Sequence, residues 1–70
     1  MNFDELNAEM GRSRYTIPKL AKEVGISNQA MYERFKGETQ FKQGEIVIIK
    51  RLLNLSDKRI IEIFFDEKVS

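Results

Sequence analysis

Apolar residues recur every three or four positions along most of the chain, which is the spacing of a helix that buries one face. Phe3, Leu6 and Met10 follow this spacing and predict a short amphipathic helix over residues 2–12. Two of its acidic residues, Asp4 and Glu5, lie in the first turn, where the helix dipole favours negative charge. The pattern therefore indicates that the chain opens with a helix.

The segment from residue 16 to residue 37 predicts two short helices joined by a tight turn. Thr16 is suited to cap the first of them, which Gly25 ends. After a three-residue turn, Ser27 is suited to cap the second helix, which ends at Gly37. A turn this short does not allow antiparallel packing, so the helices are expected to cross at a steep angle. That arrangement is the helix-turn-helix.

Two further apolar segments, residues 43–54 and 56–66, predict C-terminal helices. The β-branched run Ile46–Ile49 favours a strand locally, but the segment is longer than a usual strand. The apolar string at residues 60–65 fits either a helix, which is favoured, or a strand that pairs with a partner chain. The expected fold is one all-α domain of about five short helices, residues 1–70, and the alternative is an α+β fold with a C-terminal strand.

The expected core draws one apolar face from each of the first four helices. Its members are Leu6, Met10, Leu20, Ala21, Val24, Met31, Phe35, Ile46, Ile49 and Leu53. The last segment carries more apolar residues than so small a core can cover, namely Ile60, Ile61, Ile63, Phe64, Phe65 and Val69. We therefore expect Ile63, Phe64 and Phe65 to form an interface, most naturally that of a homodimer.

The composition narrows the possible chemistry. The chain has no cysteine and no histidine, which excludes thiol nucleophiles, imidazole bases and the usual zinc ligands. No pair of nucleophile and base, no phosphate loop and no metal-ligand set can be assembled. The longest apolar run, Ile46–Ile49, is far below the roughly 18 residues of a membrane span. We expect a cytoplasmic, non-enzymatic protein with no cofactor, no metal and no membrane partner.

Charge is distributed unevenly although the net charge is only +1. Residues 1–11 carry three acidic side chains and no basic one, and residues 43–70 carry five of each. Residues 12–42 carry seven basic side chains against three acidic ones. A local basic segment within a nearly neutral protein can present one attractive face to phosphate groups.

The same central segment resembles a known family. The residues that carry the resemblance are Thr16, Leu20, Ala21, Val24, Gly25, Ile26, Ser27, Met31 and Gly37. In these positions the chain resembles the Cro and repressor-type (lambdoid) helix-turn-helix family. A second set of positions is similar to the small Cro-like regulators of temperate phages of Gram-positive bacteria, namely Met31, Tyr32, Gly37, Phe41, Glu45, Ile46, Ile63, Phe64 and Phe65. The resemblance implies a dimeric, sequence-specific transcriptional regulator that binds an operator in double-stranded DNA inside the bacterial host cell.

Candidate DNA contacts follow from the helix-turn-helix geometry, in which the first residues of the second helix enter the major groove. The candidates for reading bases are Asn28, Gln29, Tyr32 and Glu33, whose polar groups can pair with adenine or cytosine edges. The candidates for phosphate contact lie at the start of the first helix of the helix-turn-helix and in the loop after its second helix. They are Arg14, Thr16, Ile17, Lys19, Lys36, Thr39 and Lys42.

One position departs from the family pattern. Many relatives pair an arginine of their first helix with a glutamate near the end of the recognition helix, and Met10 and Phe35 occupy these positions here. We expect an apolar contact to replace that ion pair, which avoids the cost of burying two charges. The shift also places Arg34 where relatives usually have an apolar residue, and this leaves the rotation of the recognition helix open.

A second function remains compatible with the sequence. A small antirepressor could use the same scaffold to bind another phage regulator protein, because a fold does not determine a function. The low net charge, the acidic Glu33 and Glu38 beside the expected DNA face, and the apolar tail favour this alternative. Binding to duplex DNA that weakens steeply with salt would distinguish the two.

Overall fold

A computed structural model describes residues 1–65 of the chain, and this part contains five helices and no strand. The helices are α1 (Phe3–Arg12), α2 (Ile17–Val24), α3 (Asn28–Phe35), α4 (Gln43–Leu52) and α5 (Asp57–Phe64). The all-α fold is therefore confirmed, and the C-terminal strand of the alternative is wrong, because residues 57–64 are helical. Residue 66, the expected end of the last helix, and Val69 lie outside the described residues.

Side-chain caps determine where most of the helices begin. The hydroxyl oxygens of Thr16, Ser27 and Ser56 each accept a hydrogen bond from the amide three residues later, at 3.3, 3.0 and 3.0 Å. Asn2 caps α1 in the same way, with 3.1 Å between its Oδ1 and the amide of Glu5. The caps at Thr16, Ser27 and Ser56 were predicted from the sequence, and these three predictions are confirmed.

α3 and α4 end slightly earlier than the sequence pattern indicates, whereas α1 and α2 end where it predicts. The helix expected to reach residue 54 ends at Leu52, and Asn54 adopts a left-handed backbone with φ of 55°. The helix expected to end at Gly37 stops at Phe35, and Gly37 itself has φ of 83°. An apolar periodicity marks the buried face of a helix but continues into the turn that follows, so it overestimates the length.

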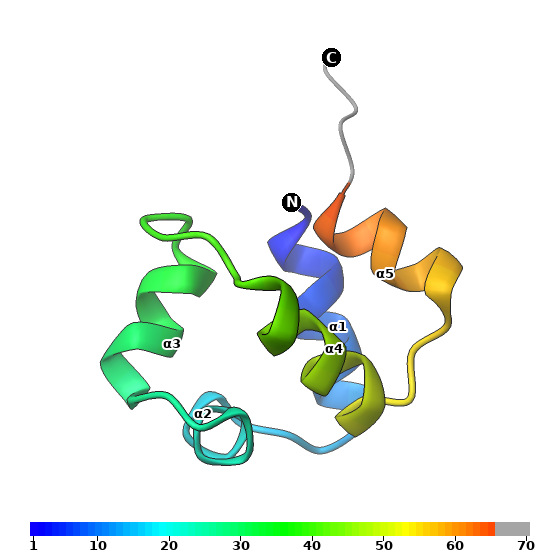
Figure 1. Cartoon of the computed structure of the whole chain (residues 1–70). Helices are drawn as coiled ribbons and strands as arrows, with labels where there is room; N and C mark the ends of the chain where they lie inside the picture. Colours follow the sequence, from blue (N-terminus) through cyan, green and yellow to red (C-terminus); the bar gives the residue numbers. More distant parts are fainter. Residues whose placement is uncertain (66–70) are drawn as a thin grey trace.

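The helices surround one apolar core. Its buried members are Leu6, Met10, Leu20, Ala21, Met31, Ile49, Leu53, Leu55, Ile60, Ile63 and Phe64. Seven of the ten residues expected in the core are among them, while Val24, Phe35 and Ile46 are half-buried and pack against its edge. Figure 1 shows α2 nearly end-on below α3, α4 across the middle of the molecule, and α1 beside α5.

Of the three residues expected at an interface, Ile63, Phe64 and Phe65, the structure leaves only Phe65 exposed. Ile63 is fully buried and Phe64 is buried against the ring of Phe41, with 5.3 Å between the ring centroids. Phe65 remains 54% exposed, and Ile61, one turn earlier, is 58% exposed. Ile60, Ile63 and Phe64 are spaced three and four residues apart on α5, so they share its inner, buried face.

Polar contacts join α5 to α1. The guanidinium of Arg59 bonds the carboxylates of Glu5 and Glu9, with 2.7 Å between its Nε and Oε2 of Glu9. The amide of Asn2 also donates to the carbonyl of Ile63 at 2.7 Å. The first and last described helices are thus held side by side. Among residues 1–65, no helix has the length and apolar character needed to cross a bilayer.

Candidate nucleic-acid interface

The turn between α2 and α3 sets how the two helices meet. Gly25 closes α2 in a left-handed conformation, with φ of 94° and ψ of 28°, and its amide donates to the carbonyl of Ala21 at 2.8 Å. The amide of Ile26 donates to the same carbonyl at 3.0 Å. Ala21 is fully buried, so no larger side chain fits without displacing its neighbours. These contacts fix the point from which α3 starts.

The outer face of α3 carries the four residues expected to read bases. Asn28, Gln29 and Tyr32 are exposed, and Glu33 is half-buried. These residues form two pairs one turn apart, at positions 28 and 32 and at positions 29 and 33, so the structure brings them together on one side of the helix. The amide of Gln29 donates to the carboxylate of Glu33, with 3.3 Å between Nε2 and Oε2. Asn28 and Tyr32 form no side-chain hydrogen bond within the described part of the chain.

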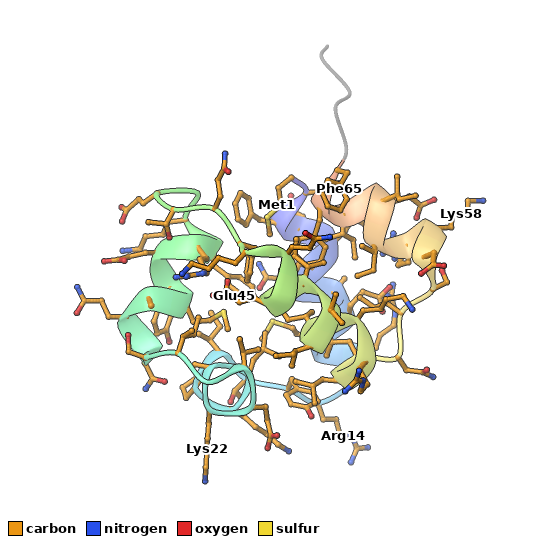
Figure 2. All side chains as sticks on the ribbon, viewed as in Figure 1. Met1, Arg14, Lys22, Glu45, Lys58 and Phe65 are labelled. Atoms are coloured by element: carbon orange, nitrogen blue, oxygen red, sulfur yellow. The ribbon has the colours of Figure 1, made fainter. Side chains whose placement is uncertain are left out.

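The first group of expected phosphate contacts gathers at the start of α2. Arg14, Thr16 and Lys19 are exposed, and the ammonium of Lys19 lies 5.0 Å from the centre of the Tyr15 ring. Ile17 turns its half-buried side chain toward the core, so it can offer only its backbone amide. Figure 2 places Arg14 on the side of the molecule where α2 lies. Arg14 has φ of 59°, a backbone conformation that is rare outside glycine.

The second group lies in the loop between α3 and α4. Lys36, Thr39 and Lys42 are all exposed, and Lys42 directly precedes α4. This loop and α2 lie at opposite ends of α3 (Figure 1). The exposed face of α3 is therefore flanked on both sides by the residues expected to contact phosphate.

A buried ion pair between α3 and α4 was not predicted from the sequence. The guanidinium of Arg34 meets the carboxylate of Glu45 through two hydrogen bonds, 2.8 Å from Nε to Oε1 and 3.0 Å from Nη2 to Oε2. Both side chains are only 11% exposed. Arg34 also donates from Nη1 to the carbonyl of Ala30 at 3.1 Å. Figure 2 shows Glu45 between the two helices.

Glu45 has a second partner in the loop. Its Oε1 accepts a hydrogen bond from the amide of Lys42 at 3.0 Å, which caps the start of α4. Burial raises the pKa of Glu45, but the hydrogen bonds from Arg34 and from this amide outweigh burial and keep the pKa below its usual value. The carboxylate is therefore held in its charged form. Glu45 is the sole acidic residue of α4, and this was the available signal in the sequence.

The ion pair defines the rotation of the recognition helix, which the sequence left open. Met10 is buried and Phe35 is half-buried, packing edge-on against Phe41 with 5.9 Å between the ring centroids. The ion pair joins α3 to α4 and not to α1, and it fixes how α3 is turned about its own axis. Arg34 points inward, so Asn28, Gln29 and Tyr32 point outward.

Comparison with known proteins gives partial matches. The chain is 40% identical over 63 residues to the nucleoid occlusion factor SlmA of Vibrio cholerae, 38% to that of Vibrio campbellii and 36% to that of Aliivibrio fischeri. Each match covers 90% of this chain and 31% of the relative. The chain thus spans about a third of the length of these relatives. No family model matches the chain, and no solved structure matches it.

Proposed function

We propose that the chain is a DNA-binding regulator that inserts α3 into the major groove of double-stranded DNA. The observation that carries this proposal is the exposed face of Asn28, Gln29 and Tyr32 on a short helix whose start is fixed by the turn after α2. Side-chain amides can donate to and accept from adenine in the major groove. Basic residues at both ends of the helix support the same function, because phosphate contacts orient a protein on the duplex.

The partial relatives support this proposal at a coarse level. Their name, nucleoid occlusion factor, refers to the nucleoid, the compacted bacterial chromosome. A helix-turn-helix that contacts DNA would be the part that this chain shares with them. The finer proposal is a Cro-like phage regulator that binds its operator as a dimer in the host cytoplasm. It is supported by the resemblance of the sequence, and its dimer also by the exposed apolar side chains of Ile61 and Phe65.

A salt titration tests the proposal. The protein is bound to a labelled duplex of mixed sequence at low salt, and the binding constant is followed as sodium chloride is raised. We expect the logarithm of the constant to fall linearly with the logarithm of the salt concentration, with a slope of about 0.9 for each phosphate contacted. Absence of duplex binding at low salt, or binding that salt does not weaken, would contradict the proposal.

An antirepressor that binds another regulator protein is the second candidate. The observation that favours it is the hydrogen bond between Gln29 and Glu33, which engages two of the four base-reading candidates with each other. Glu33 also adds a negative charge to a face that would meet phosphate. In this case the chain would bind the other regulator at salt concentrations that abolish any binding to duplex.

A further inference from the structure

The two ends of α3 are held by different kinds of contact. Its first turn is fixed by the Ser27 cap and the short connection to α2. Within the helix, Met31 is the single fully buried side chain. In the last turn, Phe35 is half-buried and packs edge-on against Phe41, a contact that resists displacement of the helix but sets its angle only loosely. The directional contact in the second half of α3 is that of Arg34.

The contact between Arg34 and Glu45 is directional. Two parallel hydrogen bonds between a guanidinium and a carboxylate fix relative angle as well as distance. The same oxygen of Glu45 that accepts from Arg34 also accepts from the amide of Lys42. A single carboxylate thus ties the helix with the base-reading face to the loop with a candidate phosphate contact.

We propose that Glu45, together with Arg34, is a positioning residue that sets the register between the outer face of α3 and the segment around Lys42. This inference rests on the proposed binding to DNA. Base contacts require placement to within a fraction of an ångström, whereas phosphate attraction tolerates small displacements. The ion pair therefore increases the preference of the chain for one DNA sequence over another, and it contributes little to the general affinity for duplex DNA.

The test measures the preference for a selected DNA sequence separately from the general affinity for duplex DNA. A duplex is first selected with the wild-type chain from a randomised pool, and a scrambled duplex of the same composition serves as the reference. The variant combines Arg34→Met with Glu45→Gln, which leaves no unpaired buried charge and keeps an oxygen for the Lys42 amide. We expect its ratio of selected to scrambled affinity to fall about tenfold, the cost of one lost base contact. Affinity for the scrambled duplex and the salt slope should stay unchanged.

A matched control applies the same chemistry to another ion pair. Lys50 and Asp57 lie 3.3 Å apart between the end of α4 and the start of α5, away from α3, and both are more exposed. The variant Lys50→Met with Asp57→Asn should leave the affinity ratio unchanged. If the Arg34 and Glu45 variant does not fold, Arg34→Lys provides the second test, because lysine keeps the charge and loses the two-pronged geometry.

The outcomes distinguish this inference from the proposed function. If the wild-type chain selects a sequence but the ratio is unaltered in the folded variant, the positioning role is wrong and DNA binding stands. An equal loss of ratio in the control would also overturn the positioning role. If the wild-type chain selects no sequence, the proposed function fails, and the positioning role fails with it.

Discussion

At the scale of single residues, the turn between α2 and α3 depends on Gly25. Its φ of 94° lies in the left-handed region, and no atom lies within 4 Å of the position that a Cβ would occupy. The cost of a substitution therefore arises from the backbone alone. Gly11, in the last turn of α1, is equally open but has an ordinary helical backbone.

These two glycines make a matched pair for mutation. We expect Gly25→Ala to lower the free energy of unfolding by about 1–2 kcal/mol, the penalty of a left-handed alanine. Gly11→Ala should raise it by about 0.5–1 kcal/mol, because alanine restricts the unfolded chain and favours the helix. Urea denaturation followed by circular dichroism measures both. Equal effects of the two substitutions would contradict the role given to Gly25.

Side chains on the proposed DNA face should fall into two classes. Asn28→Ala is expected to reduce discrimination between base pairs at one position by about 1–3 kcal/mol. Lys42→Ala should weaken binding to all duplexes about equally and lower the salt slope by roughly one. Competition binding with single-base variants of a selected duplex separates the classes. A change in sequence preference for Lys42→Ala alone would reverse the assignment.

At the scale of elements, the sequence predicts the helices well because each depends on local signals. The caps at Thr16, Ser27 and Ser56 and the glycine at position 25 act within four residues, and all four are confirmed. The ion pair of Arg34 and Glu45 joins residues 11 apart on different helices. Such a pair depends on how helices pack, which local periodicity does not contain.

Which face of α5 is buried also depends on helix packing, which the local sequence pattern does not contain. Apolar residues surround most of this helix, so the sequence predicts that some are exposed without saying which. Because α5 packs against α1, its buried side chains are those of Ile60, Ile63 and Phe64. Arg59 helps to fix this orientation of α5, because its guanidinium donates hydrogen bonds to Glu5 and Glu9 of α1.

The contact between α1 and α5 should make stability depend on pH. The hydrogen bond from Arg59 lowers the pKa of Glu9, and the pKa of Glu45 is lowered as well. Carboxylates with a depressed native pKa stabilise the fold above their unfolded value of 4.5, and this stability is lost as pH falls below it. We expect the urea midpoint to drop between about pH 6 and about pH 3.

A variant isolates the contribution of Arg59 to this pH dependence. Arg59→Gln should lower the midpoint at about pH 6 and show a smaller further drop on acidification. Lys50→Gln, which breaks an ion pair with the exposed Asp57, should leave the acid-induced drop as in the wild-type chain. A drop of the same size in the Arg59 variant would show that Glu9 does not contribute.

At the scale of the whole molecule, two apolar side chains at the C-terminal end of the described residues are exposed, Ile61 on α5 and Phe65 directly after it. Ile61 and Phe65 lie one turn apart, and Met1 lies beside Phe65 (Figure 2). Met1 and Phe65 line a groove of about 440 Å³, whose other lining residues are the apolar Phe3, Phe41, Ile46 and Phe64 together with Arg34, Gly37, Thr39 and Gln40. An exposed apolar region on a small protein typically marks an interface.

We expect this region to support the proposed homodimer. Sedimentation at micromolar concentration should show dimers for the wild-type chain and folded monomers for Phe65→Asp, with weaker binding to duplex DNA. Phe64→Asp serves as the contrast, because a buried charge at that position should unfold the protein instead. A wild-type chain that stays monomeric while it binds duplex tightly would exclude the dimer.

The joining of α1 to α5 also bears on the order in which the chain folds. Arg59 lies 54 residues from Glu5 and 50 from Glu9, so these contacts close almost the entire chain, whereas α2 and α3 meet through a short turn. Closing a long loop is entropically costlier, which favours late docking of α5 onto a preformed α2–α3 nucleus. Stopped-flow measurements should then show Arg59→Gln accelerating unfolding with little effect on refolding, and Ser27→Ala slowing refolding. The lifetime of the native state would be governed by the docking of α5.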